Sequence, residues 1–254
     1  CLVGSEMCIR DRNNICIFCS TFVGLESVRY LLEANYPVDL VAVPGYEDND
    51  QVVELCKEHG GKYTLVDVAI EEIYDREFYW LVNAWCPKIL SVDFLSKFNK
   101  RMNFHPSFIP WGRGSHSASW SLIEGSKFGV SLIEMEEEID AGKIYAQKEI
   151  KFDLKTKASE LTGIAKNKLC ELFQDTWGDI YSGHHLLTDP KVNGLGSYHL
   201  KKELEETRLL ELDQSITVQD FIRLVNAHDF LPASGANIKI NKELFSISLK
   251  LEKL

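Results

Sequence analysis

Short apolar runs alternate with segments of helical periodicity along the first 105 residues of the chain. A continuous apolar run is typical of a strand buried on both faces, and apolar residues three and four apart are typical of a helix that packs on one side. These patterns predict strands at 14–19, 38–43, 63–66, 81–84 and 101–105 and helices at 24–34, 50–59 and 91–98, with 75–80 either a short helix or the approach to a strand. Alternating strands and helices predict an α/β protein, with a mainly parallel twisted sheet and helices on both of its faces.

The rest of the sequence predicts a second set of elements. These are a loop at 111–116, a helix at 117–124, extended segments at 129–135 and 145–152, a long helix at 157–181, a loop-rich stretch at 183–199, a helix at 217–227 and a hairpin over 236–252 that turns at Asn241 and Lys242. We therefore expect a main domain over 13–182 and a small C-terminal appendage over 183–254. Residues 1–12 have no start methionine and do not lead into the first strand, so we expect them to be a non-native leader.

Composition limits the expected partners. The 254-residue chain has a net charge of −10 and no run of Lys and Arg, whereas nucleic-acid binding needs a basic face. No apolar run reaches the ~20 residues of a membrane span, so we expect neither nucleic acid nor membrane as a partner. The seven cysteines are scattered, and Cys16 and Cys19 lie inside an apolar run, which favours buried thiols in a reducing cytoplasm. His184 and His185 have no third ligand nearby, so no metal is expected.

One stretch, 103–107 (NFHPS), carries candidate chemistry. On a strand, Asn103 and His105 leave the same face. Pro106 keeps His105 extended and ends the strand. An amide donor and an imidazole therefore lie side by side at the carboxyl end of a strand, where open α/β sheets bind ligands. Asp140, beside a glycine-containing turn further along, is a carboxylate that could orient the imidazole.

The order of these residues resembles the N10-formyltetrahydrofolate-dependent formyltransferases over roughly residues 14–182, and most closely over 81–150. The family pattern runs Asn-x-His-Pro-Ser, a proline and a Gly-rich loop, Gly-Val-Ser/Thr and Asp-x-Gly-x-Ile. It is met by Asn103, His105, Pro106, Ser107, Pro110, Gly114, Gly129, Val130, Ser131, Asp140, Gly142 and Ile144. Each piece alone is weak, but the ordered set is specific. The resemblance implies a Rossmann-like formyltransferase fold, with a catalytic domain over 13–182.

The resemblance also implies the reaction, transfer of a formyl group from N10-formyltetrahydrofolate to an amine without a metal. Asn103 would stabilise the developing oxyanion, His105 would share that duty or shuttle a proton, and Asp140 would orient His105 and take the amine proton through water. Taken singly, these residues are more typical of a strand cap and a turn; the ordered set favours the catalytic interpretation. The folate site would lie in the loop after the 81–84 strand and close against Asp140. Its candidate residues are Trp85, Cys86, Pro87, Ile89 and Leu90, which could otherwise be a hydrophobic connection.

Candidate substrate-binding residues fall at three places in the sequence. They are Ser20, Thr21, Phe22, Arg113, Gly114, His116 and Tyr198. The first three open a helix whose free N–H groups suit a phosphate. Arg113 and His116, in the Gly-rich loop, could contact pyrophosphate or hexose, and Tyr198 could stack on a base. Each could also be an ordinary loop or packing residue.

The tail indicates a branch of the family. Residues 196–199 (GSYH) and the short helix-plus-hairpin tail are similar to sugar-nucleotide N-formyltransferases of the dTDP-amino-dideoxysugar type, which act in O-antigen, lipopolysaccharide and other surface-glycan synthesis. Glycinamide ribonucleotide and methionyl-tRNA stay open as acceptors. Ile133 stands where many relatives carry His, which keeps a catalytically impaired folate or nucleotide-sugar binding protein in view. Near-alternating apolar residues in 236–252 predict docking to the core or a homodimer through the C-terminal region.

Overall fold

A computed structural model of the chain describes residues 13–45, 49–73, 78–194, 196–230 and 235–252. The expected leader at 1–12 and residues 75–77 of the ambiguous stretch at 75–80 lie outside the described residues, and residues 78–80 of that stretch belong to a strand. The chain divides into two compact units. The first unit is built from the residues up to His105, from Leu132–Ala146 and from Leu169–Thr188. The second unit is built from Pro106–Ser131, Gln147–Lys168 and the residues from Asp189 onwards.

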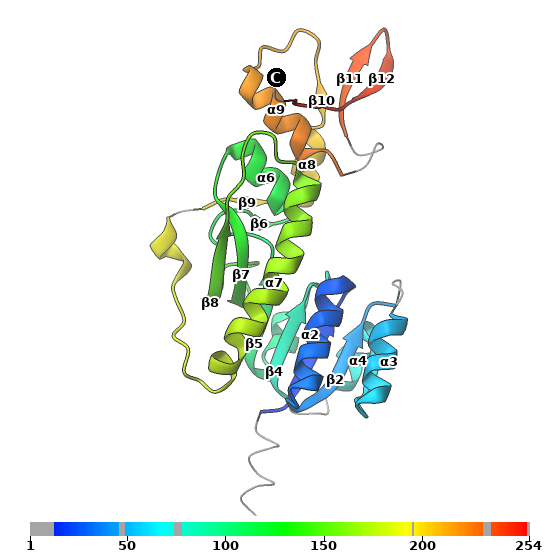
Figure 1. Cartoon of the computed structure of the whole chain (residues 1–254), viewed down its shortest axis with the longest axis vertical. Coiled ribbons are helices and arrows are strands. Elements are labelled where there is room, and N and C mark those ends of the chain that lie inside the picture. Colours follow the sequence, from blue (N-terminus) through cyan, green and yellow to red (C-terminus); the bar gives the residue numbers. More distant parts are fainter. Residues whose placement is uncertain (1–12, 46–48, 74–77, 195, 231–234, 253–254) are drawn as a thin grey trace, which may run out of the picture. The chain divides into compact units, whose positions relative to one another are not determined.

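Seven strands form one sheet in the order β3-β2-β1-β4-β5-β7-β8. They are β1 (Ile15–Cys19), β2 (Val38–Val43), β3 (Tyr63–Leu65), β4 (Phe78–Ala84), β5 (Phe98–His105), β7 (Phe128–Glu134) and β8 (Ile144–Ile150). Figure 1 labels β2, β4, β5, β7 and β8 of this sheet. The β1–β2, β2–β3, β1–β4 and β4–β5 pairs are parallel, which confirms the predicted fold class. The strand order reverses at β1, because the chain runs out through β2 and β3 before it returns to β4. The crevice outside the carboxyl ends of β1 and β4 is therefore the expected ligand site.

Helices cover both faces of this sheet, as the sequence predicted. They are α2 (Thr21–Glu33), α3 (Asp50–Glu58), α4 (Val66–Glu72), α5 (Val92–Leu95) and α7 (Ala158–Tyr181). On one face, Trp177 of α7 packs against Trp80 of β4, with ring centroids 5.0 Å apart. On the other face, Phe94 of α5 packs against Phe18 of β1 at 5.8 Å. None of the helices in the described part of the chain is both long and apolar enough to span a membrane.

Several boundaries differ from the sequence prediction; among them, β5 begins at Phe98 rather than residue 101, and the helix expected at 91–98 spans only Val92–Leu95. Helix α4 was not predicted, and the strand expected at 63–66 ends at Leu65. Val66, Ala69 and Ile73 are buried along one side of this segment, and so short a pattern is easily lost among neighbouring apolar residues. Strand β4 begins at Phe78 rather than residue 81, because its aromatic residues already favour extended structure. Helix α2 begins at Thr21 rather than residue 24.

The second unit contains shorter elements. They are β6 (Arg113–Gly114), α6 (Ser117–Glu124), the 3-10 helix η2 (Pro190–Asn193), β9 (Tyr198–His199), α8 (Lys201–Glu206), β10 (Leu209–Leu210), α9 (Val218–Ala227), β11 (Ala236–Ile240) and β12 (Glu243–Ile247). The predicted helix at 217–227 and the predicted hairpin are confirmed, and the hairpin turns at Asn241 and Lys242 with φ of 50° and 71°. The β6–β9 pairing and α8 were not predicted, since two-residue strands carry no periodicity.

Candidate active site

Three predicted catalytic side chains come together in the first unit. The amide nitrogen Nδ2 of Asn103 donates to Oδ1 of Asp140 at 3.1 Å. Nδ1 of His105 lies 3.4 Å from Oδ2 of the same carboxylate. The side chains of His105 and Asp140 are about nine-tenths buried, at 6% and 10% exposure, so their contact is largely shielded from water. One carboxylate therefore holds both an amide and an imidazole in fixed orientations.

Strand β5 explains how Asn103 and His105 reach one face. Phe104, between them, points to the opposite face and packs on Phe173 of α7, with ring centroids 4.9 Å apart. Asn103 pairs in register with Asn83 of β4, and His105 is the last residue of β5. The alternation predicted from the sequence is confirmed, and it puts the two polar side chains at the carboxyl end of the strand.

The turn that carries Asp140 is held by its backbone. Asp140 has φ of 53°, a left-handed conformation that an Asp tolerates better than most residues. Two residues later, Gly142 passes so close to β7 that a Cβ atom would overlap the carbonyl oxygen of Glu134. A glycine is therefore required there for the turn to bring the carboxylate back to the end of β5.

Asn83 is a site residue that the sequence reasoning missed. Its Oδ1 accepts from the Cys86 N–H at 3.0 Å, and its Nδ2 donates to the Cys86 carbonyl at 3.1 Å. This buried side chain pins the start of the loop after β4, the loop predicted to bind folate. A signal was present, because an Asn inside an otherwise apolar strand needs a partner to offset its burial.

The predicted folate residues differ in their exposure. Trp85 has φ of 68°, which bulky residues rarely adopt, and pairs with Cys19 in an isolated bridge. Cys86 lies in the apolar core, and Leu90 packs against the same cluster. Pro87 is exposed, and Ile89 is 79% exposed. The loop thus combines an anchored start with an apolar side chain that faces solvent.

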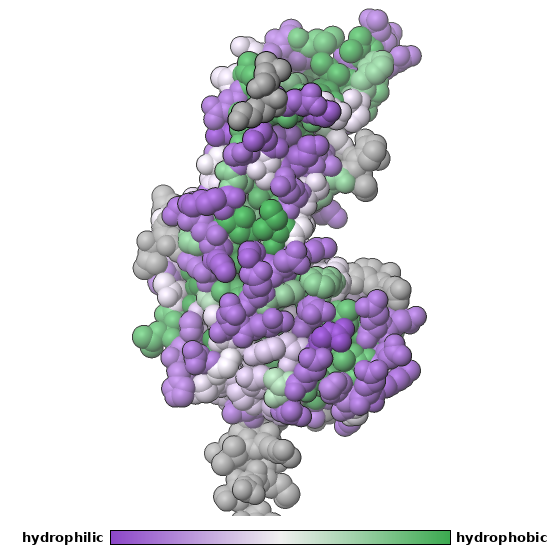
Figure 2. Space-filling model, in the orientation of Figure 1, coloured by the Kyte–Doolittle hydropathy of each residue, from purple (hydrophilic) through white to green (hydrophobic). Residues whose placement is uncertain are grey.

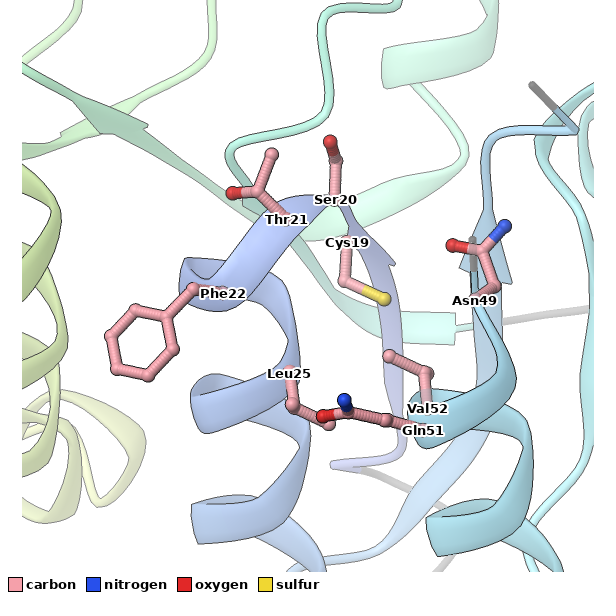
Figure 3. Close-up of a pocket in the computed structure, with 8 residues that line it drawn as sticks. All are labelled: Cys19, Ser20, Thr21, Phe22, Leu25, Asn49, Gln51 and Val52. Carbon is pink, nitrogen blue, oxygen red and sulfur yellow. The ribbon is translucent and has the colours of Figure 1, made fainter. Parts of the chain in front are cut away.

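The predicted phosphate-binding segment lines a cavity of about 340 Å³ in the first unit (Figure 3). Ser20, Thr21 and Phe22 form one side at the start of α2, and Asn49 and Gln51 lie at the start of α3. Thr21 has φ of 59°, a strained value for a β-branched residue. Phe22 is 50% exposed. Two helix N-termini therefore border one cavity, and each contributes partial positive charge.

The remaining predicted substrate residues lie in the second unit. The Arg113 guanidinium carbon is 5.7 Å from the centroid of the Tyr198 ring, and Gly114 pairs with His199 across β6 and β9. His116 precedes α6 with φ of 58°. Partial burial of its ring and, next, the charge of Lys201 lower the pKa of His116. Tyr198 therefore lies beside the loop that carries Arg113 and Gly114, a neighbour that the sequence did not predict.

The other motif residues act as structural supports. Ser131 of β7 donates its hydroxyl to the Ser107 carbonyl at 2.7 Å and accepts from the Ile109 N–H at 3.3 Å. Ile133 is buried in β7. Within the described ranges, no group of three or more His, Cys, Asp and Glu side chains could hold a metal ion.

Taken together, the fold and the site define a Rossmann-like α/β protein with an amide, an imidazole and a carboxylate at the carboxyl edge of its sheet. The family model for formyl transferases matches residues 34–171, and the chain belongs to that family.

Two kinds of curated relative resemble part of the chain. The dTDP-4-amino-4,6-dideoxyglucose formyltransferase of Mycobacterium tuberculosis is 29% identical over 145 residues, which cover 54% of this chain and 61% of that protein. The methionyl-tRNA formyltransferase of Lactobacillus acidophilus is 30% identical over 184 residues, which cover 70% of this chain and 55% of that protein. In both comparisons, the chain spans less than two thirds of the relative's length.

Solved structures share the fold over nearly the whole chain. A 4-N formyltransferase from Francisella tularensis superposes with a TM-score of 0.79 at 17% identity, covering 96% of this chain and all 100% of that one. The N-formyltransferase from Helicobacter canadensis, solved with folinic acid and dTDP-3-aminofucose, gives a TM-score of 0.72 at 18% identity and covers 91% and 85% of the two chains. At these identities the likeness establishes the formyltransferase fold.

Proposed function

We propose that this protein transfers a formyl group from N10-formyltetrahydrofolate to the amine of a nucleotide-linked amino sugar during surface-glycan synthesis, of which lipopolysaccharide O-antigen is one form. The observation that carries the proposal is the carboxylate of Asp140, which contacts both the Asn103 amide and the His105 ring. Formyl transfer needs a hydrogen-bond donor to the developing oxyanion and an acceptor for the proton of the amine. Asn103 can supply the first, and His105 with Asp140 can supply the second.

The chemistry assigns one role to each side chain. The Asn103 amide carries two N–H bonds; one donates to Asp140, and the other can donate to the oxygen that becomes negative as the amine attacks the formyl carbon. Such a donor contributes ~3 kcal/mol in comparable acyl transfers. His105 and Asp140 take the proton lost by the attacking amine, and a proton is returned to the folate nitrogen as its bond to the formyl carbon breaks. No covalent enzyme intermediate is needed.

Several residues suit a folate co-substrate. The exposed Ile89 side chain offers apolar surface to a flat ring system. Asn83 fixes the loop's first residues, so its backbone groups are preorganised for hydrogen bonds. Folate would supply the activated one-carbon unit, while the residues of this chain bind it, orient it and move protons.

Two features support a nucleotide-linked acceptor. The cavity beside Ser20, Thr21 and Phe22 is bordered by helix N-termini, which favour an anionic group. Arg113, in the second unit, can make charge-assisted hydrogen bonds to phosphate. The net charge of −10 disfavours a tRNA acceptor, although methionyl-tRNA formyltransferases are among the relatives.

A transfer assay tests the reaction and the acceptor together. The protein would be incubated with N10-formyltetrahydrofolate and separate panels of dTDP-, UDP- and GDP-linked 3- and 4-amino sugars, with glycinamide ribonucleotide and methionyl-tRNA as rival acceptors. Mass spectrometry should detect one added formyl group on an amino sugar, and His105→Ala should abolish it. Formylation of a rival acceptor alone would replace the proposed substrate. Folate binding without any transfer would favour the alternative raised by Ile133, a catalytically impaired protein that binds folate or a nucleotide sugar.

The C-terminal hairpin supports a homodimer through this region. Its exposed apolar side chains include Leu244, 63% exposed, and Phe245, 45% exposed. Figure 2 shows hydrophobic surface over the β11–β12 hairpin. A second copy would remove this surface from water. Sedimentation should give the mass of two chains at micromolar concentration and of one chain for Leu244→Lys; a wild-type monomer would refute the dimer.

We further propose a cytoplasmic location and a functional division of the chain. The side chains of Cys16, Cys19, Cys56, Cys86 and Cys170 are buried, which suits a reducing compartment. Residues 13–182 would form the catalytic domain, and 183–254 would be an appendage for the acceptor and the dimer. A truncated protein ending at residue 182 that still formylated its acceptor with unchanged KM would contradict this division.

A further inference from the structure

Within the second unit, residues 196–199 run beside the loop that carries Arg113. The Ser197 N–H donates to the Pro110 carbonyl at 3.1 Å, and the Arg113 N–H donates to the Ser197 carbonyl at 3.0 Å. The Ser115 N–H donates to the His199 carbonyl at 3.0 Å. Three main-chain hydrogen bonds therefore fix the backbone of this loop from a segment more than eighty residues away in the sequence.

Two glycines make this close approach possible. A Cβ atom on Gly114, at φ of 84°, would overlap the carbonyl oxygen of His199. A Cβ atom on Gly196, at φ of 70°, would overlap the carbonyl oxygen of Pro110. Both positions have backbone conformations that other residues rarely adopt, so the sequence is adapted to this contact on each segment.

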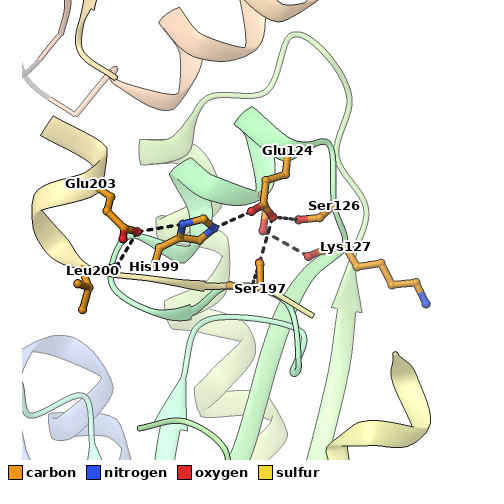
Figure 4. Close-up of polar contacts among 9 residues, drawn as sticks. Glu124, Ser126, Lys127, Ser197, His199, Leu200 and Glu203 are labelled. Atoms are coloured by element: carbon orange, nitrogen blue, oxygen red, sulfur yellow. Dashed lines mark hydrogen bonds and ion pairs between the residues drawn. The ribbon is translucent and has the colours of Figure 1, made fainter. Parts of the chain in front are cut away.

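Side chains lock the two segments together (Figure 4). Nε2 of His199 lies 2.6 Å from Oε1 of Glu124, and Nδ1 lies 3.3 Å from Oε2 of Glu203. The imidazole stacks on Trp120, with centroids 3.7 Å apart and planes within 7°. The Ser197 hydroxyl donates to Oε2 of Glu124 at 3.0 Å. We call Glu124, Ser197, His199 and Glu203 the latch.

The latch also reaches both of its neighbours along the chain. The Gly112 N–H donates to the Ser197 hydroxyl oxygen at 3.0 Å, which ties the latch to the Arg113 loop. The Leu200 N–H donates to Oε2 of Glu203 at 3.0 Å, which ties it to the start of α8. The latch therefore connects α6 with α8 through the His199 imidazole, and α6 with the Arg113 loop through the Ser197 hydroxyl.

The surroundings of His199 make its imidazole unsuited to act directly on a substrate. Each ring nitrogen meets a carboxylate, and one face of the ring lies on an indole. An imidazole used in this way is committed to holding its neighbours. Its effect on catalysis must therefore come through the loop that it fixes.

We propose that His199 is a positioning residue, which through the latch holds Arg113 and His116 in the geometry that binds the amine acceptor. This inference rests on the proposed function, because it assumes that the Arg113 loop contacts that acceptor. Fixing the loop before binding reduces the entropy lost on association, so loosening it weakens acceptor binding more than it slows chemistry.

The test combines kinetics with hydrogen exchange on the full chain. His199→Gln removes one of the two ring contacts and the stacked imidazole, and Glu203→Gln removes one charge but keeps an oxygen for Leu200. Glu206→Gln, on the exposed side of the same helix, is the matched control. For His199→Gln we expect a rise of about tenfold in KM for the acceptor, with KM for N10-formyltetrahydrofolate and kcat within about twofold. The Arg113 and Ser115 amides should exchange about tenfold faster.

Glu203→Gln should change both quantities in the same direction but less, and Glu206→Gln should change neither. Unchanged exchange at Arg113 and Ser115 in His199→Gln would overturn the latch. Faster exchange with an unchanged acceptor KM, or an equal loss in both KM values and kcat, would overturn the positioning role. A wild-type protein that formylates no acceptor would refute the proposed function, and exchange at the two amides would still decide whether the latch exists.

Discussion

Two histidine clusters in this chain differ in what surrounds the imidazole. In the first unit, His105 contacts one carboxylate, Asp140, which also accepts a hydrogen bond from the Asn103 amide. In the second unit, His199 meets Glu124 and Glu203 at its two nitrogens and stacks on an indole. The first cluster lies at the end of strand β5, and the second lies beside the pairing of the short strands β6 and β9.

The difference shows that an imidazole–carboxylate contact does not by itself define a catalytic histidine. The His105 cluster lies at the carboxyl edge of the sheet and includes an amide donor that can serve a developing negative charge. The His199 ring is enclosed on two edges and one face by the protein. Location in the fold and the neighbouring donor therefore separate a reactive cluster from a supporting one.

The largest expected effect on the difference between the two histidine clusters is that of Asp140→Asn. Asn tolerates the left-handed backbone at this position, so the turn should survive while the charge is lost. We expect the formyl-transfer rate to fall by about 100-fold or more, because the proton acceptor and the orientation of His105 are lost together. Asp179→Asn, on the exposed surface of α7, is the control. Turnover within twofold of wild type would remove Asp140 from the mechanism.

Two glycine substitutions compare the regions directly. Gly142→Ala would push against the Glu134 carbonyl beside Asp140, and Gly114→Ala would push against the His199 carbonyl beside the latch. Each should lower stability by ~2 kcal/mol through overpacking, measured by chemical denaturation. The kinetic effects should differ, with kcat lowered in the first and acceptor KM raised in the second.

Gly163→Ala, on α7, is the control and should raise stability by ~0.5–1 kcal/mol, because among the described residues nothing beyond the helix's own backbone lies within 4 Å of the added Cβ. Identical kinetic profiles for Gly142→Ala and Gly114→Ala would contradict a division of labour between the two regions.

A smaller effect should follow from Asn83→Ala, which tests the support behind the first cluster. The change leaves the buried N–H and C=O of Cys86 without their side-chain partner. We expect KM for N10-formyltetrahydrofolate to rise about tenfold and stability to fall by ~1–3 kcal/mol. Asn167→Ala, exposed on α7, should change neither. A normal folate KM in Asn83→Ala would mean that this loop does not bind the co-substrate.

The smallest expected effect concerns a third histidine, His228, which contacts the Thr207 hydroxyl at 2.9 Å. Burial, then the charge of Arg208, lowers the pKa of His228 below its usual 6.5, against a weaker opposing effect of Glu205. Below pH 6.5 the unfolded chain therefore binds a proton more readily than the folded chain. Stability should be complete above that pH and decline as pH falls through the folded pKa.

Thermal unfolding measured from above pH 6.5 downwards gives the fall in stability with falling pH, and His228→Gln should make this fall smaller. His116, whose pKa is also lowered, contributes in the same direction, so His116→Gln separates the two contributions. An unchanged slope in both variants would exclude these rings as its source.

Much of the first unit was predictable because its elements bury regular patterns. The apolar runs at 14–19 and 38–43 correspond to β1 and β2, and the alternation around Phe104 placed Asn103 and His105 correctly. The contact of Asn103, His105 and Asp140 could be anticipated because these residues lie in two short motifs, Asn-x-His-Pro-Ser and Asp-x-Gly-x-Ile. By contrast, α4 was missed because its pattern is short and merges with neighbouring apolar residues.

The sequence by itself determined the fold class, the family and the residues that end β5, because period-two and helical patterns and ordered motifs are local properties. Only the tertiary structure decided that His199 meets Glu124, seventy-five positions earlier in the chain. This contact depends on two segments whose backbones approach closely at single glycines, Gly114 and Gly196. The sequence pattern within one segment does not encode which carbonyl of a distant segment will lie against such a glycine.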